Sequence, residues 1–150
     1  MRGKKLCLTS CGWRYAKANH MKTVLIADDN LASRELLKEA LEASGFRLLE
    51  ASDGREALDT IRTEAPDLVL LDIQMPSLDG FAVFRAAREL IPPSSARFIA
   101  LTAFAMESDQ RRIGDAGFEG YFAKPISISD VRKQVQRMLC DDDRARHAEL

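Results

Sequence analysis

The stretch 67–80 constrains the fold of this chain more than any other. Its apolar run, 68–71, shows no polar alternation, which is typical of a strand buried on both faces of a sheet. The run ends on Asp72, and the Met75-Pro76 and Asp79-Gly80 pairs indicate a loop directly after it. The sequence therefore predicts that a buried strand carries the Asp72 carboxylate to the edge of a sheet. An isolated Asp at such a place most often only begins a turn, so its role depends on the other strand ends.

Four further strands and five helices are predicted along the chain. The other strands are predicted at 23–27, 46–51, 97–101 and 120–123. The helices are predicted at 31–44, 53–65, 79–90, 106–116 and 127–139. Strands that alternate with helices in this way predict an α/β domain, a doubly wound five-stranded parallel sheet with helices on both faces. Because parallel crossovers are right-handed, few topologies remain.

Polar side chains stand where four of the predicted strands end. Ligands of such sheets bind beyond the carboxyl ends of the strands, and that rule gathers five residues on one rim: Asp28, Asp29, Asp72, Thr102 and Lys124. Crowded carboxylates repel one another unless a cation lies among them, and oxygen ligands without a nearby His or Cys favour a hard ion such as Mg²⁺. A Lys and a hydroxyl beside such an ion suit transfer of a phosphoryl group onto an aspartate. Each residue alone has a commoner structural role, as a helix cap, a turn or a surface lysine. Their joint placement favours the site.

The chain resembles the receiver domain of bacterial two-component response regulators over about residues 23–139. The resemblance rests on motifs that occur in order and at fitting spacing: Asp28-Asp29, Asp72 with Met75-Pro76 and Asp79-Gly80, Thr102-Ala103, and Lys124-Pro125. It implies the flavodoxin-like fold of the chemotaxis regulators, with strand order 2-1-3-4-5. It also implies that Asp72 accepts a phosphoryl group from a phosphohistidine on a histidine kinase or a histidine phosphotransfer protein.

The resemblance further implies a magnesium site and a lysine contact. Asp29, Asp72 and the backbone carbonyl of Gln74 would hold Mg²⁺, while Asp28 would act mainly through a metal-bound water. Lys124 would pair with the phosphoryl group. Its peptide bond to Pro125 would be cis, a state largely confined to proline.

A switch and a control on phosphoryl lifetime are implied as well. Thr102 would move toward the phosphoryl group and Tyr121 would rotate inward behind it. The face formed by helix 4 (106–116), strand 5 (120–123) and helix 5 (from 127) would then change its preference for a downstream protein. Gln74 and Phe104 flank the expected path of the water that attacks the acyl phosphate. We expect the bulky Phe104 to slow spontaneous dephosphorylation by crowding that water.

The leading interpretation is a single-domain response regulator or phosphorelay intermediate. The stretches 101–106 and 123–126 look more like stand-alone cell-cycle regulators and hybrid-kinase receivers than transcription-factor receivers. One alternative is a Mg²⁺-dependent phosphohydrolase that forms an aspartyl phosphate, but it needs a second Asp just after its nucleophile, and Asp72 is followed by Ile73 and Gln74. The other is a receiver fragment of a hybrid histidine kinase. A receiver is not expected to be an enzyme beyond self-phosphorylation from small donors and self-dephosphorylation.

Composition narrows the partners and the compartment. A net charge of −1 over 150 residues gives no electrostatic footprint for nucleic acid, and no apolar run approaches the roughly 18 residues that span a bilayer. Three cysteines are too few for a disulfide framework, which favours a reducing cytoplasm. Cys7, Cys11 and His20 lack the fourth ligand of a zinc site.

The predicted organisation has three parts. Residues 1–20 are expected to be an N-terminal extension, 21–140 the receiver domain, and 141–150 a charged C-terminal tail. No output domain is expected after Leu139, so the output is predicted to be a contact with another protein, or a homodimer. Leu31, near the start of the first helix, is either a docking residue for the phosphodonor or a core residue.

Overall fold

Five short strands form one parallel sheet, as the sequence predicts. The computed structural model describes residues 22–149 apart from 76–77, 91–95 and 104–105, with side chains described as far as Leu139. The sheet has the order β2-β1-β3-β4-β5, and every pairing is parallel. Its strands are β1 (Thr23–Ala27), β2 (Arg47–Ala51), β3 (Leu68–Asp72), β4 (Arg97–Thr102) and β5 (Gly120–Ala123). The predicted doubly wound fold and its strand order are therefore confirmed.

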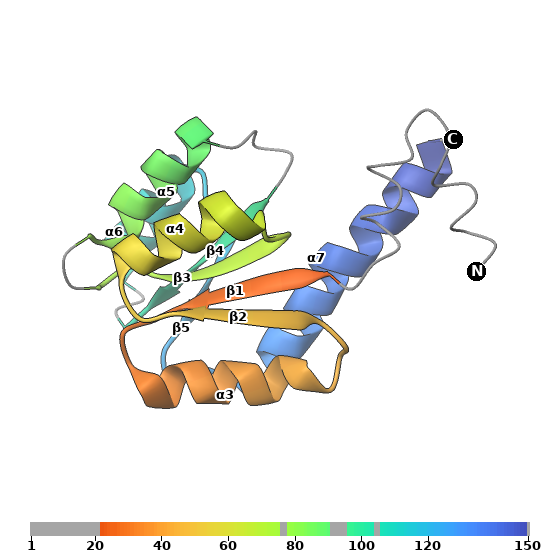
Figure 1. Cartoon of the computed structure of the whole chain (residues 1–150), viewed down its shortest axis with the longest axis horizontal. Coiled ribbons are helices and arrows are strands. Elements are labelled where there is room, and N and C mark those ends of the chain that lie inside the picture. Colours follow the sequence, from red (N-terminus) through yellow and green to blue (C-terminus); the bar gives the residue numbers. More distant parts are fainter. Residues whose placement is uncertain (1–21, 76–77, 91–95, 104–105, 150) are drawn as a thin grey trace.

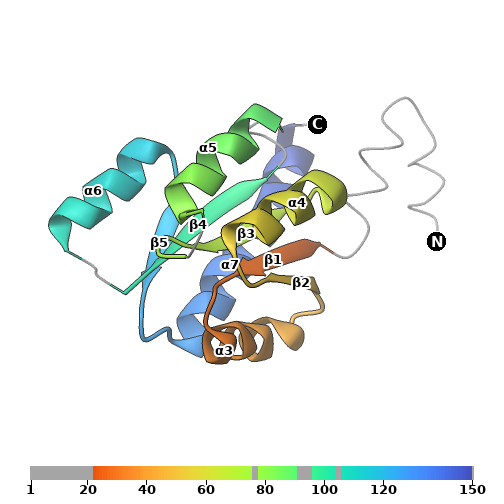
Figure 2. The ribbon, with the colours of Figure 1, turned by 60° about the vertical axis from the view of Figure 1, so that its left-hand side comes forward.

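Helices cover both faces of the sheet. They are α3 (Leu31–Glu42), α4 (Gly54–Glu64), α5 (Gly80–Leu90), α6 (Glu107–Ala116) and α7 (Ile128–Glu149). Figure 1 shows α3 and α7 on one side of the sheet and α4 and α5 on the other. The rotated view in Figure 2 shows α6 beside α5, on the side of the sheet opposite to α3. Among the described residues, no helix combines the length and the apolar character needed to cross a bilayer.

The two faces of the sheet bury separate apolar clusters because strand side chains alternate in direction. Leu25 and Leu71 point into a cluster with α4, α5 and α6, whereas Val24 and Leu70 point into a cluster with α3 and α7. All four side chains are fully buried. Complete burial of one such side chain is worth about 1.5–3 kcal/mol. Unbroken apolar runs such as 68–71 are therefore a direct consequence of a sheet covered twice.

Side-chain hydrogen bonds cap the starts of α3, α4 and α5. Asn30 Oδ1 accepts a hydrogen bond from the Ser33 N–H at 3.2 Å at the start of α3. Asp53 Oδ1 accepts one from the Glu56 N–H at 2.8 Å at the start of α4, as the sequence predicts. Asp79 Oδ1 accepts one from the Ala82 N–H at 2.8 Å, so Asp79 precedes α5 instead of belonging to it. These bonds satisfy N–H groups that have no partner within the helix.

The last helix is longer than predicted. The sequence predicts that the last helix ends at Leu139. In the structure, α7 continues to Glu149 and includes most of the predicted charged tail. Residues 140–149 contain neither glycine nor proline, so nothing in them stops a helix that is already formed. The division into an extension, a domain and a tail stays a prediction, because residues 1–21 lie outside the described residues.

Gly80 lets α5 begin directly against the end of β3. A Cβ atom at this position would lie 2.5 Å from the Asp72 carbonyl oxygen and 2.8 Å from Ile73 Cα. The Gly80 N–H donates to the Ile73 carbonyl at 3.0 Å. Any larger residue would push the loop after β3 away from the helix, so this glycine helps to fix the end of the strand that carries Asp72.

Candidate functional site

The structure brings four predicted site residues together at the carboxyl ends of the strands. Lys124, directly after β5, places its Nζ 2.8 Å from Asp28 Oδ2 and 3.2 Å from Asp72 Oδ2. Oxygen atoms of Asp28, Asp29 and Asp72 all lie within 4.8 Å of one another. Parallel pairing produces this arrangement, because β1 and β5 run in the same direction as β3 and end at the same rim.

Neighbouring carboxylates differ sharply in their surroundings. Asp28 is fully buried and Asp72 is only 3% exposed, whereas Asp29 is exposed. Burial raises the pKa of Asp72 from 3.8 to about 6. The Asp28 charge also raises it, while the Gln74 N–H and the Lys124 ammonium lower it. Asp72 is therefore largely ionised at neutral pH, in a site that makes its charge unfavourable.

Lys124 is the counter-ion of this acidic group. Burial lowers the pKa of Lys124, but its close contact with Asp28 and the charge of Asp72 outweigh burial, so the pKa lies above the usual 10.5. The ammonium is thus charged at any physiological pH. The Lys124-Pro125 peptide bond is cis, as the resemblance implied.

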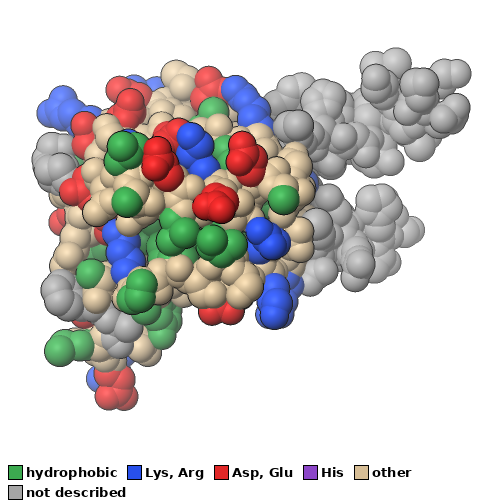
Figure 3. Space-filling model, turned by 90° about the horizontal axis from the view of Figure 1, so that it is seen from below, with side chains coloured by type: hydrophobic (Ala, Val, Ile, Leu, Met, Phe, Trp, Pro, Cys, Tyr) green, Lys and Arg blue, Asp and Glu red, His purple; other side chains and the backbone are tan. Residues whose placement is uncertain are grey.

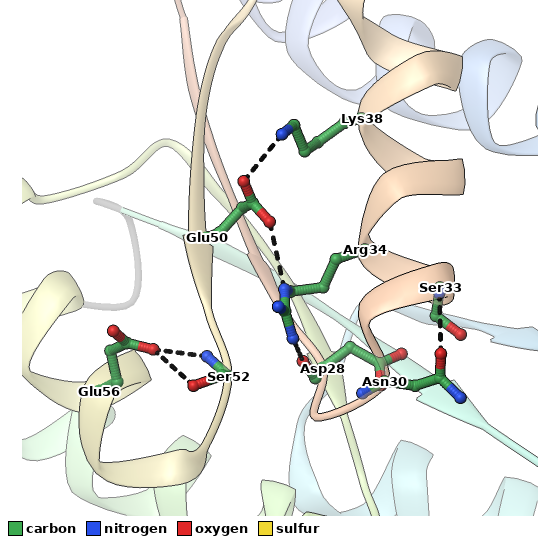
Figure 4. Close-up of polar contacts among 8 residues, drawn as sticks. All are labelled: Asp28, Asn30, Ser33, Arg34, Lys38, Glu50, Ser52 and Glu56. Atoms are coloured by element: carbon green, nitrogen blue, oxygen red, sulfur yellow. Dashed lines mark hydrogen bonds and ion pairs between the residues drawn. The ribbon is translucent and has the colours of Figure 1, made fainter.

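The turn after β1 is held by hydrogen bonds around Asp28. Its N–H donates to the Ala51 carbonyl at 3.1 Å, and its Oδ1 accepts from the Asn30 N–H at 2.9 Å. Its carbonyl accepts from Arg34 Nη1 at 2.7 Å (Figure 4). Asp28 Oδ2 is buried and accepts no well-directed hydrogen bond from the described residues; its compensation is the Lys124 charge.

This donor set fits a hard divalent cation. The three carboxylates offer only oxygen atoms, and one of those oxygens is buried without a well-directed donor. Carboxylate oxygens in small number suit Mg²⁺, which keeps several of its waters. Gln74 stands beside this group, since its N–H donates to Asp72 Oδ1 at 3.0 Å. An exposed Asp29 leaves the acidic group open to solvent on one side.

The predicted switch residues flank the acidic group on β4 and β5. Thr102 is 4% exposed at the end of β4, and its carbonyl accepts from the Lys124 N–H at 2.8 Å. Tyr121 lies on β5 and is 39% exposed, so its ring is turned toward solvent. Thr102 and Gln74 also line a small hollow that opens to solvent beside α6. Phe104 lies outside the described residues, and its effect on phosphoryl lifetime stays a prediction.

The face that carries α3 exposes apolar side chains next to the acidic group. Leu31, the first residue of α3, is 56% exposed, so its interpretation as a core residue is wrong. Ile126 and Ile128, at the start of α7, are only partly buried. Figure 3 views this face and shows apolar side chains in its middle, with acidic and basic side chains around them.

Sequence reasoning missed the charged residues beneath the turn after β1. Arg34 contacts the Asp28 carbonyl, Glu50 contacts Arg34, and Lys38 contacts Glu50. Arg34 and Lys38 are four positions apart, so their common helix face could have been read from the sequence. Glu50 lies on β2, and its place in this group depends on the pairing of β2 with β1.

Comparisons with known proteins agree with this geometry. A family model described as "Response regulator receiver domain" matches residues 24–136. The polar-differentiation response regulator DivK of Brucella anthropi is 38% identical over 120 residues, which cover 80% of this chain and 98% of DivK.

Solved structures show the same likeness. A CheY-like receiver domain protein from Methanospirillum hungatei has 27% identity and a TM-score of 0.76, covering 84% of this chain and 99% of that one. The receiver domain of the sensor histidine kinase PA1611 from Pseudomonas aeruginosa has 27% identity and a TM-score of 0.71, covering 80% and 98%. In that structure a magnesium ion is coordinated in the active-site cleft.

Proposed function

This chain belongs to the response regulator receiver domain family, and from that premise we propose that Asp72 accepts a phosphoryl group from a phosphohistidine. The observation that carries the proposal is the position of Lys124, whose ammonium contacts carboxylates from two different strand ends. Such an arrangement offers a nucleophile and a fixed positive charge at one point. Phosphoryl transfer needs little more than positioning and charge neutralisation.

The proposed reaction uses groups already in place. An oxygen of the Asp72 carboxylate attacks phosphorus, the bond from phosphorus to the histidine nitrogen breaks, and the imidazole keeps the electron pair and takes up a proton. The product is an acyl phosphate on Asp72. Lys124 then holds a phosphoryl oxygen. Because the pKa of Asp72 is about 6, most molecules carry the nucleophilic carboxylate at neutral pH.

We assign the magnesium site to Asp28, Asp29, Asp72 and the backbone carbonyl of Gln74. The all-oxygen donor set supports this assignment. So does the magnesium ion in the PA1611 receiver structure. Bound Mg²⁺ would neutralise charge on the phosphoryl oxygens. Asp29 is the most accessible ligand, whereas Asp28 is buried against Lys124.

The proposed output is a change in protein binding on the face formed by α6, β5 and α7. Thr102 would turn its hydroxyl to the phosphoryl group and Tyr121 would move inward. Tyr121 and Met106 are both large and exposed on this side, at 39% and 67%. A ring that leaves solvent changes the apolar surface offered to a partner protein or a second copy of the chain.

We propose that the phosphodonor docks on the other side, at the start of α3. Leu31 supports this because a large apolar side chain stands exposed three residues after Asp28. A histidine kinase or a histidine phosphotransfer protein offers its histidine from a helix, which could pack on this face. The proposed activity of the chain itself is limited to self-phosphorylation from small donors and self-dephosphorylation, in the cytoplasm.

Labelling with acetyl phosphate and Mg²⁺ tests the proposal. We expect one phosphoryl group per chain by intact-mass spectrometry, no labelling when Mg²⁺ is chelated before acetyl phosphate is added, and no labelling of Asp72→Asn. Asp59→Asn is the matched control, because Asp59 is an exposed carboxylate on α4. Equal labelling of Asp72→Asn and the wild type would refute Asp72 as the acceptor. Rapid multiple turnover of small phosphate esters would instead favour the phosphohydrolase.

A further inference from the structure

Three charged side chains form a chain of contacts from α3 to β2, beneath the turn that carries Asp28 and Asp29. Arg34 Nε donates to Glu50 Oε1 at 3.1 Å, and Lys38 Nζ lies 2.9 Å from Glu50 Oε2. Figure 4 shows Arg34 between Glu50 and Asp28, with Lys38 at the far end. The Arg34 side chain is only 13% exposed, whereas Glu50 and Lys38 are more than a third exposed.

Arg34 reaches two partners at once. Besides Glu50 it donates through Nη1 to the Asp28 carbonyl at 2.7 Å. A guanidinium can do this because its donors lie in one rigid plane, whereas a lysine has a single nitrogen on a flexible stem. Together with the bonds from Asp28 to Ala51 and Asn30, this contact fixes the backbone and the side chain of Asp28 from three directions.

The contact with Glu50 holds the Arg34 guanidinium against the Asp28 carbonyl. Arg34 stands close to an acidic group, and an unrestrained guanidinium there could turn to the carboxylates and take the place of a cation. The hydrogen bond from Lys38, followed by the contact with Arg34, lowers the pKa of Glu50 despite its partial burial. Glu50 is therefore ionised at neutral pH and holds Arg34 from the side away from the carboxylates.

We propose that Arg34 is a positioning residue, which holds Asp28 and Asp29 in the geometry that a divalent cation requires by tying the Asp28 carbonyl to Glu50 on β2. The inference rests on the proposed magnesium site. Residues that orient metal ligands typically change metal affinity by 10- to 100-fold when they are mutated. Arg34 acts through the backbone and touches no cation itself.

If Arg34 acts only through its charge, its replacement should change Mg²⁺ affinity in one direction. If Arg34 positions Asp28, its replacement should change the affinity in the opposite direction. Replacing a cationic residue near a cation site removes repulsion, so an effect of charge alone would tighten Mg²⁺ binding. Loss of positioning would weaken it. For Arg34→Met we expect the dissociation constant for Mg²⁺ to rise about tenfold, measured by calorimetry on the full chain. Arg34→Lys keeps the charge, but its single nitrogen cannot contact both Glu50 and the Asp28 carbonyl. Its dissociation constant for Mg²⁺ should therefore lie between those of Arg34→Met and the wild type.

Two controls separate this role from general effects of charge. Lys38→Met removes a positive charge from the same cluster but leaves the contacts of Arg34 in place, so the dissociation constant should stay within about twofold or fall. Arg47→Met breaks an ion pair of similar length on the same strand, Arg47 to Glu64 at 2.9 Å, which does not touch Asp28. It should leave Mg²⁺ binding unchanged.

Amide hydrogen exchange gives a second readout without metal. The Asn30 N–H donates to Asp28 Oδ1 at 2.9 Å, so its protection reports how firmly the turn is held. Arg34→Met should speed exchange of Asn30 about tenfold while Leu25, in the core of β1, keeps its protection. Equal acceleration of both amides would show that Arg34 only stabilises the whole domain, and would overturn the proposal.

The outcomes distinguish this inference from the function on which it rests. A wild-type chain that binds no Mg²⁺ refutes the proposed metal site, and the positioning role with it. A wild type that binds Mg²⁺, with Arg34→Met binding as tightly or more tightly, refutes only the role of Arg34.

Discussion

Replacing Asp72 by Asn should stabilise the protein at neutral pH in the absence of divalent cations. Asp72 is almost fully buried beside Asp28, and burial raises its pKa from 3.8 to about 6. Each pKa unit corresponds to 1.36 kcal/mol, so holding the charged form in the folded state costs up to about 3 kcal/mol. Asn at this position keeps the size and can still accept from the Gln74 N–H, but carries no charge. The attraction of Lys124 is already included in that pKa, so we expect a gain of up to about 3 kcal/mol.

The raised pKa of Asp72 also sets the pH dependence of this gain. Because the folded-state pKa of Asp72 is raised, the folded state binds its proton more tightly than the unfolded state does. The contribution of Asp72 to stability is therefore fully present below pH 3.8 and is lost as pH rises to about 6. The advantage of Asp72→Asn over the wild type should be absent in acid, grow across this window, and stay constant above it.

Urea unfolding followed by circular dichroism, in a chelator, measures this difference at a series of pH values. Taking the difference between Asp72→Asn and the wild type cancels the titration of carboxylates far from Asp72. Asp59→Asn, on an exposed residue of α4, is the matched control. Added Mg²⁺ should narrow the gap, because it binds the folded wild type and stabilises it by mass action. A variant that is less stable than the wild type at neutral pH, or a gap independent of pH, would refute the reasoning.

Three further variants probe other parts of the site. Lys124→Met should lower the free energy of unfolding by about 3 kcal/mol in chelator, because it leaves buried carboxylates without their counter-ion; urea unfolding measures the loss, and added Mg²⁺ should restore part of it. Gly80→Ala should cost about 1–3 kcal/mol, since its Cβ would meet the Asp72 carbonyl at 2.5 Å; thermal unfolding measures this, and an unchanged melting temperature would contradict it. Leu31→Ser should leave labelling by acetyl phosphate unchanged but slow transfer from a phosphohistidine protein several-fold, and equal transfer rates would exclude Leu31 from docking.

Local patterns predicted the elements and the rim because both are encoded over a few residues. The apolar run before Asp72 predicts a strand buried on both faces, and Asp53 before a helical pattern predicts a cap. The structure contains both. The order of the strands came from the resemblance and not from periodicity, which carries no information on which strands pair. The end of α7 was missed because charged residues do not stop a helix unless glycine or proline accompanies them.

The finer organisation of the site depends on contacts that no local pattern contains. Asp28 and Asp29 are adjacent residues of the same type, yet only the first is buried against Lys124. Which one turns inward is decided by the direction in which the chain leaves β1. The contact of Arg34 with Glu50 likewise exists only because β2 packs beside β1.

Lys124 bridges Asp28 and Asp72 before any phosphoryl group arrives. If Asp72 is phosphorylated as proposed, the ammonium that would pair with the phosphoryl group is already in direct contact with the acceptor carboxylate. A signalling cycle can then proceed by exchange of one anionic neighbour for another, with the lysine nearly stationary. In the proposed switch, the movement in each cycle would then fall to Thr102, and the same small domain could be phosphorylated and dephosphorylated repeatedly without unfolding.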